Sequence, residues 1–297
     1  MNSYNDKEEK IIEMIESLIR NGVDDELIIS RFESKIFDFK KPELYFWFAK
    51  NVKGIDVKAH EQAVIDKRDP EWNYKFAKNV KGSDINAHGQ VIINSGSLEW
   101  NYKFAKDIKG ADVEAHERVI IRNGDPCYNY MFARYVKGAD VRAHGQAIIN
   151  SGDLEWNFNF AKNVRGSDVK AHGQVIKDSG DPELNYKFAR YIDGIDTKSN
   201  GHGKAVINSC DLEWNYKFAR DIIGADVRAH EQVIINSGDP EWNYKFARYI
   251  AGADVKAHEQ VVFKYGNQIE SELELLDNYL DDAIASSEKD ASKSMTK

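Results

Sequence analysis

All eight histidines of the chain occupy one position of a recurring segment: His60, His88, His116, His144, His172, His202, His230 and His258. Imidazoles in such a ladder could bind metal ions, act as catalytic bases or sense pH. Metal binding requires ring nitrogens ~2.0–2.1 Å from one ion, but equivalent atoms on packed neighbouring helices lie ~10 Å apart. We therefore expect neutral core histidines whose pKa lies below the ordinary ~6.5, with structural pH sensing as the alternative.

Asparagine forms a second ladder with the same spacing: Asn73, Asn101, Asn129, Asn157, Asn185, Asn215 and Asn243. Its position falls on the expected buried face of a helix, where an amide must find hydrogen-bond partners. We expect it to bond the backbone, or the histidine or aspartate of an adjoining unit, and so to fix the register between units. The alternative is direct ligand recognition, as in RNA-binding repeats, which would require an open face.

An aspartate ladder precedes the histidines: Asp56, Asp84, Asp112, Asp140, Asp168, Asp196, Asp226 and Asp254. Aspartate is a preferred helix N-cap, and no pair of carboxylates converges within a unit. We therefore assign these residues no catalytic role.

A row of cations is a candidate binding surface: Lys50, Lys78, Lys106, Arg134, Lys162, Arg190, Arg220 and Arg248. Aromatic residues stand one helical turn earlier: Phe46, Tyr74, Tyr102, Tyr130, Phe158, Tyr186, Tyr216 and Tyr244. Cations interleaved with aromatics could hold a nucleic-acid backbone with stacked bases. The other interpretation is a solvated face stabilised by i,i+4 ion pairs, such as Glu71 with Lys75.

A second candidate surface places isoleucine among polar residues, on the side expected to face away from the core: Ile65, Ile93, Ile149 and Ile235, with Lys58, Gln62, Asn86, Gly89, Gln90, Arg142, Gly145, Gln146, Arg228, Glu231 and Gln232. Such a row is a plausible groove for another protein. Contact between neighbouring helices would explain it equally well.

These ladders arise from a tandem repeat built on the phrase Glu-Trp-Asn-Tyr-Lys-Phe-Ala-Lys. Eight units begin at Pro42, Pro70, Leu98, Pro126, Leu154, Pro182, Leu212 and Pro240. Every interval is 28 residues except one of 30, where two residues are inserted near 197–202. A fixed period of this length is the signature of a solenoid or another repeat array.

Each unit reads as helix, turn, helix, which the second unit illustrates. Asp69 precedes Pro70, a helix cap followed by proline at the first helical position. We expect a first helix over 71–81, ended by Gly82, and a second helix over 85–94. Such short helices are stable only when packed against neighbours.

Placing the residues at ~100° intervals predicts the buried faces. In the first helix the buried residues are expected to be Trp72, Phe76, Ala77 and Val80, while Tyr74, Lys75 and Lys78 point outward. In the second helix they are Ala87, His88, Val91 and Ile92, while Asn86, Gly89, Gln90 and Ile93 point outward.

The ends differ from the repeats in charge and pattern. Residues 1–41 carry ten acidic and seven basic residues and predict a helical cap, with helices over 7–20 and 24–34. Residues 42–267, the eight repeats, carry 31 of each sign. Residues 268–285 predict an acidic capping helix and 286–297 a disordered tail. A dedicated DNA-binding domain would be basic.

The architecture resembles the α-solenoid class, which includes armadillo, HEAT and tetratricopeptide arrays, although the 28-residue unit is shorter than theirs and lacks their consensus residues. The predicted fold is an all-α solenoid of eight two-helix repeats with helical caps. The resemblance implies scaffolding and partner binding.

The functional prediction is a non-enzymatic, protein-binding scaffold or adaptor in the cytoplasm, with steric blocking of a partner as one form that this function could take. No phosphate loop, nucleophile–base pair or metal cluster stands in the sequence, so no cofactor and no metal are expected. No apolar run is long enough for a membrane span, the N-terminus is too polar for a secretory signal, and two distant cysteines predict reduced thiols. The alternative function is binding of RNA or single-stranded DNA through the cation–aromatic row.

Overall fold

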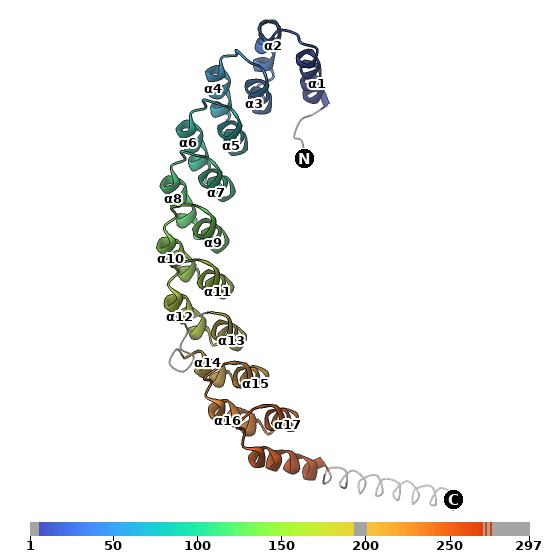
Figure 1. Cartoon of the computed structure of the whole chain (residues 1–297), viewed down its shortest axis with the longest axis vertical. Coiled ribbons are helices and arrows are strands. Elements are labelled where there is room, and N and C mark those ends of the chain that lie inside the picture. The colour runs from blue at the N-terminus through green and yellow to red at the C-terminus, as the bar shows by residue number, and fades with distance from the viewer. Residues whose placement is uncertain (1–5, 193–200, 270, 272–273, 275–297) are drawn as a thin grey trace, which may run out of the picture. The chain divides into compact units, whose positions relative to one another are not determined.

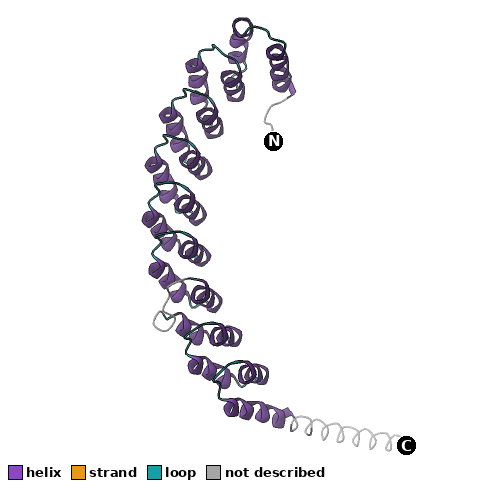
Figure 2. Cartoon of the chain, viewed as in Figure 1, coloured by secondary structure: helices purple, strands orange, loops and turns teal. Residues whose placement is uncertain are grey.

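The structure is a computed structural model that describes residues 6–192, 201–269, 271 and 274 (Figure 1). The described part contains helices and turns and no strand (Figure 2). The helices pack in consecutive pairs, which confirms the predicted all-α solenoid of repeats. The chain divides into two compact units, Met1–Val169 and Lys170–Lys297.

The first unit contains two N-terminal helices followed by repeat helices. Their bounds are α1 (Asp6–Arg20), α2 (Asp25–Asp38), α3 (Pro42–Asn51), α4 (Val57–Lys67), α5 (Pro70–Asn79), α6 (Ile85–Ser95), α7 (Leu98–Asp107), α8 (Val113–Asn123), α9 (Pro126–Tyr135), α10 (Val141–Ser151) and α11 (Leu154–Asn163). We call the first helix of each repeat helix A and the second helix B. From α3 to α9, each helix A packs on its own helix B and on the helix A of the next repeat.

The second unit continues the same pattern. Its helices are α12 (Val169–Ser179), which begins at the last residue of the first unit, α13 (Pro182–Tyr191), α14 (His202–Ser209), α15 (Leu212–Asp221), α16 (Val227–Ser237) and α17 (Pro240–Tyr249). A further helix covers 255–269 and is the helix B that follows α17. The insertion expected near 197–202 falls mostly on residues 193–200, outside the described residues. The capping helix expected over 268–285 and the tail over 286–297 lie almost entirely outside them as well.

Short polar side chains begin both helices of a repeat. At helix A of the second repeat, Asp69 accepts hydrogen bonds from the N–H groups of Glu71 and Trp72. At helix B, six members of the aspartate ladder accept an N–H of the first turn: Asp56, Asp84, Asp112, Asp140, Asp226 and Asp254. Asp196 lies outside the described residues. These caps satisfy N–H groups that have no partner inside the helix.

Helix A is shorter than the sequence predicted, and the expected helix end at Gly82 was wrong. The helix α5 ends at Asn79, and Val80 is extended, with φ −101° and ψ 120°. The Val80 side chain is buried, and Gly82 adopts φ 83° in the turn that follows. The β-branched valine favours extended backbone, and its burial fixes the point at which the chain reverses toward helix B.

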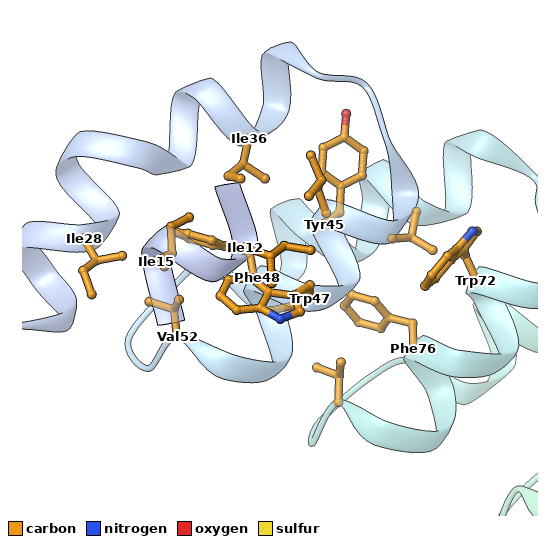
Figure 3. Packing of buried hydrophobic residues seen from close by; sticks show 14 residues of the cluster. Ile12, Ile15, Ile28, Ile36, Tyr45, Trp47, Phe48, Val52, Trp72 and Phe76 are labelled. Atoms are coloured by element: carbon orange, nitrogen blue, oxygen red, sulfur yellow. The ribbon is translucent and has the colours of Figure 1, made fainter. Parts of the chain in front are cut away.

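The core of each repeat is a stack of one phenylalanine from helix A and one aliphatic residue from helix B. Phe76 and Ile92 of the second repeat are fully buried, as are Phe104 and Ile120 of the third. The N-terminal helices α1 and α2 close the first repeat with Ile12, Ile15, Ile28 and Ile36, which pack near Phe48 and Val52 (Figure 3). The helix α2 runs to Asp38, one turn beyond its predicted end.

None of the described helices is both long enough and apolar enough to cross a membrane.

Candidate functional site

The histidines form the centre of each repeat and are at most 1% exposed. The rings of His60, His88, His116, His144, His202, His230 and His258 each lie against a phenylalanine of their own helix A. In the pair Phe218–His230 the ring centroids are 4.8 Å apart. Burial lowers the pKa to about 4 for five of them: His88, His116, His144, His202 and His230. Burial also lowers the pKa of His60 and His258, against the opposing effect of a nearby glutamate. These seven rings are therefore neutral at pH 7.

The asparagine ladder orients these rings. His88 Nδ1 lies 2.7 Å from Asn73 Oδ1, and the same contact joins His116 to Asn101 at 2.7 Å. Asn101 Nδ2 donates to two carbonyls, Ser97 O at 2.8 Å and Ile92 O at 3.0 Å. Because the amide group already donates both protons, its oxygen must accept, and Nδ1 must carry the imidazole proton.

The partner of each asparagine differs in part from the expectation. Its histidine belongs to the same repeat, not to an adjoining one, so this bond ties helix A to helix B. The bond that crosses between repeats runs from the amide to a carbonyl of the preceding helix B, such as Ile92 O for Asn101. This geometry places the amide inside the protein, where it cannot read a ligand directly.

Buried glutamates complete the polar chain in some repeats, and the sequence prediction missed them. Glu117 Oε1 lies 3.1 Å from His144 Nε2 and accepts the Asp140 N–H at 2.6 Å. Glu231 makes the equivalent contacts with His258 and Asp254, at 3.2 and 2.5 Å. The glutamate thus joins one helix B to two polar groups of the next repeat.

Glu61 shows the same arrangement with looser geometry. It accepts the Asp84 N–H at 2.5 Å, but His88 Nε2 lies 3.2 Å away without hydrogen-bond alignment.

The residue directly after each histidine is glutamate in some repeats and glycine in others, and this alternation in the sequence marks the buried glutamates. Glycine replaces glutamate in other repeats, and Gly89, Gly145 and Glu231 are all buried. The expectation that these three residues lie on the outward face of helix B was therefore wrong. The physical reason is that neighbouring B helices pack closely along this line, so the buried sector of helix B is wider than one apolar stripe.

The first repeat departs from the pattern because Tyr45 stands where later repeats carry asparagine. His60 Nδ1 has no hydrogen-bond partner among the described residues. Its Nε2 lies 3.1 Å from Glu33 Oε1, contributed by α2. The N-terminal helices therefore supply the carboxylate that an earlier repeat would have supplied.

The cation row of helix A is exposed at all eight positions. Four of the eight aromatic residues one turn earlier are buried, so the expectation that they point outward was wrong for Tyr102, Phe158, Tyr186 and Tyr216. Phe46, Tyr74 and Tyr130 are half-buried. Tyr74 packs against Trp100 of the next repeat, with ring centroids 5.3 Å apart. These rings form the contact between consecutive A helices, and Tyr244 is the exposed exception.

Ion pairs occupy part of this surface. Lys78 Nζ lies 2.8 Å from Asp107 Oδ2, and Arg220 makes a two-point contact with Asp221 at 2.7 and 2.9 Å. The expected Glu71–Lys75 pair is present at 2.6 Å. These contacts partly neutralise the positive charge that would attract a phosphate backbone.

Helix B presents half-buried isoleucines beside exposed amides, as at Ile65, Ile93, Ile149 and Ile235. Gln90 Nε2 donates to Asn94 Oδ1 at 2.8 Å, and Gln146 pairs with Asn150 in the same way. Between α4 and α6 a hollow of about 590 Å³ is lined by Ile65, Val91 and Asn94, among others. The isoleucines therefore serve the contact between neighbouring B helices and also border a groove.

Three exposed tyrosines at the ends of A helices were not predicted from the sequence. Tyr135, Tyr191 and Tyr249 are each more than half exposed, and each follows a member of the cation row. Arg134 lies 5.4 Å from the Tyr135 ring centroid, and Arg248 lies 5.7 Å from that of Tyr249. We call these three residues the tyrosine row. The signal in the sequence is an Arg-Tyr pair where other repeats carry Lys-Asn, Lys-Asp or Arg-Asp.

The fold and this interior define a helical repeat protein in which buried Asn–His contacts recur, and in which a buried glutamate extends that contact to the next repeat at Glu117 and Glu231. Comparison of the sequence with protein-family models and with curated proteins finds no match, and comparison of the structure with solved structures finds none either.

Proposed function

We propose that the protein is a non-enzymatic scaffold that binds another protein through the helix A surface. The observation that carries the proposal is the tyrosine row. Tyrosine and arginine are enriched at the energetic centres of protein interfaces. Ile223, which is 93% exposed, adds an apolar contact in the repeat that carries Asp221 instead of tyrosine.

The alternative of nucleic-acid binding has weaker support. Stacking on successive bases requires open aromatic faces, but four of the eight aromatic partners of the cation row are buried and three more are half-buried. Two of the cations, Lys78 and Arg220, are also paired with Asp107 and Asp221. The proposed place of action is the cytoplasm, where the two cysteines would remain reduced.

A matched set of surface variants tests this proposal by affinity capture from the native cell, followed by quantitative mass spectrometry. The test protein is the triple variant Tyr135→Ala, Tyr191→Ala and Tyr249→Ala. The control is Gln90→Ala, Gln146→Ala and Gln232→Ala on the exposed side of helix B. We expect a partner that wild type and control capture equally, and that the tyrosine variant loses by about tenfold or more.

Purified components then separate the candidate functions. Fluorescence anisotropy with single-stranded RNA and DNA, at salt concentrations from about 50 to 200 mM, measures the alternative directly. Tight binding that weakens steeply with salt would favour the nucleic-acid function. A partner retained by the tyrosine variant but lost by the glutamine control would place the interface on helix B instead.

A further inference from the structure

The residue after each histidine is either glutamate or glycine. Glutamate stands at Glu61, Glu117, Glu231 and Glu259, and glycine at Gly89, Gly145, Gly173 and Gly203. In a glutamate repeat the carboxylate reaches the histidine and the aspartate N–H of the next repeat. After a glycine repeat, the next repeat presents the same histidine Nε2 and aspartate N–H, but the glycine supplies no carboxylate to bind them.

Gly203 of α14 shows what occupies the carboxylate position when the side chain is missing. His230 is fully buried, and its Nε2 has no hydrogen-bond partner among the described residues. A Cβ built on Gly203 would lie 3.6 Å from that nitrogen. A pocket of about 660 Å³ opens here and is lined by Gly203, Lys204, Asp226 and His230, among others.

The protonation of His230 defines what the pocket can accept. Asn215 Nδ2 donates to Val206 O and Asp211 O, at 3.0 and 2.7 Å. Its Oδ1 must therefore accept the Nδ1–H of His230, at 2.7 Å. The neutral ring consequently presents a lone pair on Nε2 to the pocket. The Asp226 N–H is the equivalent of the group that Glu231 binds at Asp254.

We propose that the pocket beside Gly203 binds a carboxylate group together with one proton. One carboxyl oxygen accepts the Asp226 N–H, and the proton lies between that carboxyl group and His230 Nε2. No covalent bond forms, and one proton is taken from solvent for each carboxylate bound. The proposal concerns a site separate from the tyrosine row and does not depend on it.

The charged groups around the pocket agree with this ligand. Lys204 of α14 lines the pocket and attracts an anion, while Asp226 is held as the cap of α16 by the Ala229 N–H at 3.1 Å. The α15 side contributes Asn215 and Phe218, which carry no charge. The bound acid therefore meets one cation, one capped carboxylate and the neutral ring of His230.

Packing alone does not require glycine at this position. A Cβ on Gly203 would meet Phe218 Cε1 at 3.2 Å, which is tight. Glu231 nevertheless carries a Cβ at the equivalent place, before the equivalent Phe246. At Gly173 a Cβ would lie 2.9 Å from Phe188 Cε1, so packing accounts for glycine there, whereas Gly203 has more clearance and borders an open pocket.

A second repeat reproduces the unsatisfied nitrogen. His116 is fully buried, its Nε2 has no hydrogen-bond partner among the described residues, and a Cβ on Gly89 would lie 3.4 Å away. The absence of a carboxylate opposite histidine is therefore a property of the glycine repeats and not an accident of one loop.

Acetate titration followed by nitrogen NMR of ¹⁵N-histidine-labelled full-length protein tests the proposal. We expect acetate to move the Nε2 resonance of His230, whereas chloride and acetamide do not. Because binding takes up a proton, the apparent Kd should rise by about tenfold for each pH unit above about 5.5. No acetate-dependent shift at any pH would mean that the position holds solvent, and the proposal would be wrong.

Two reciprocal variants sharpen the test. Gly203→Glu should place a carboxylate on His230 from within the chain and abolish the acetate response. Glu231→Gly should create a new response at His258, with acetate partly restoring the melting temperature. Circular dichroism identifies a variant that does not fold. If Gly203→Glu fails in this way, Glu231→Gly still decides, because absence of both rescue and a His258 shift would overturn the proposal.

The carboxylate could come from a small acid or from an acidic side chain of another chain. A capped tripeptide, acetyl-Ala-Glu-Ala-amide, distinguishes the two sources when compared with acetate under the same conditions. A His230 shift with acetate alone supports a small acid as ligand, and a shift with the peptide as well supports an inserted side chain. Failure of both probes overturns the proposal.

Discussion

His144 Nε2 lies 3.1 Å from Glu117 Oε1, across the junction between two repeats. The ring is held from its other side by Asn129, whose Oδ1 is 2.8 Å from Nδ1. Asn129 Nδ2 in turn donates to Asp125 O at 2.7 Å. One continuous chain of polar contacts therefore joins α8, α9 and α10. Such a fully connected buried network specifies a unique arrangement of the helices it joins.

The same contacts show which atom of the Glu117–His144 pair carries the proton. Because His144 gives its Nδ1 proton to Asn129, a neutral ring can only accept at Nε2. Burial lowers the pKa of His144 to about 4 and raises the pKa of Glu117. Both shifts favour the uncharged forms, so a protonated Glu117 carboxyl donating to Nε2 satisfies the pair. The carboxylate proposed to bind beside Gly203 would share a proton with His230 Nε2 in the same way.

Replacing Glu117 with alanine should destabilise the protein because it leaves the Asp140 N–H and His144 Nε2 buried without their partner. We expect the free energy of unfolding, measured by urea titration, to fall by about 1–3 kcal/mol. Glu114→Ala on the same helix, where the side chain is 79% exposed, is the control and should change stability by less than about 0.5 kcal/mol. Equal effects of the two variants would show that Glu117 is not part of a stabilising chain.

The asparagine ladder makes a second prediction, because α5 carries one buried and one exposed asparagine. Asn73→Ala removes the partner of His88 Nδ1 and leaves the carbonyl groups of Asp69 and Val64 without their donor. We expect a loss of about 2–4 kcal/mol, because several buried polar groups become unsatisfied together. Asn79→Ala removes an exposed bond to Lys75 O and should cost less than about 0.5 kcal/mol. Similar thermal and urea midpoints for the two variants would contradict a structural role for the ladder.

Acid should destabilise the protein through its histidines. Five histidines have a folded pKa of about 4, against ~6.5 in the unfolded chain. Their contribution to stability is complete above ~6.5 and is lost as the pH falls toward 4, because the unfolded chain binds protons that the folded chain does not. The melting temperature should therefore decrease steadily from pH 6.5 downward, and a melting temperature that stays constant from pH 6.5 to 4.5 would contradict the burial of neutral histidines.

His116 is the clearest single position for this measurement, since it faces Gly89 and no glutamate titrates beside it. Burial lowers its pKa to about 4, and the charge of Asp112 opposes that shift. His116→Gln should reduce the slope of stability against pH by up to about 1.4 kcal/mol per pH unit. A slope that the variant leaves unchanged between pH 6.5 and 4.5 would show that His116 does not titrate as proposed.

The sequence predicted the repeat architecture because a fixed period makes every local signal recur. The caps at Asp69 and Asp84, the turn near Gly82 and the central position of His88 all follow from one unit. Helix length was overestimated because a periodic pattern does not show that Val80 turns into the core as extended backbone. That outcome depends on the contact between repeats, which propensity does not describe.

The site was predicted less completely for a related reason. Helical periodicity assigns one buried stripe, but helix B is buried on two sides because it also meets its neighbours. Gly89 and Glu231 therefore read as surface residues, and Tyr102 and Tyr216 read as an open row. The Glu–Gly alternation after each histidine was visible in the sequence. Its role could be recognised only once the structure showed that the histidine Nε2 and the aspartate N–H of the next repeat lie beside it.

A substitution at the end of α14 tests how the repeats are joined. Glycine with positive φ ends most B helices, as Gly96 does with φ 66°, but Cys210 occupies this place with φ 56°. A residue with a Cβ is strained in this conformation, by roughly 1 kcal/mol. Cys210→Gly should therefore raise the free energy of unfolding by about 0.5–1 kcal/mol, measured by urea titration in reducing buffer. Because Cys210 is exposed and unpaired, the variant should also lose any disulfide-linked dimer that forms in oxidising buffer. Cys127→Ser, a substitution in helix A away from this turn, is the matched control, and an equal gain from it would contradict the proposed strain at Cys210.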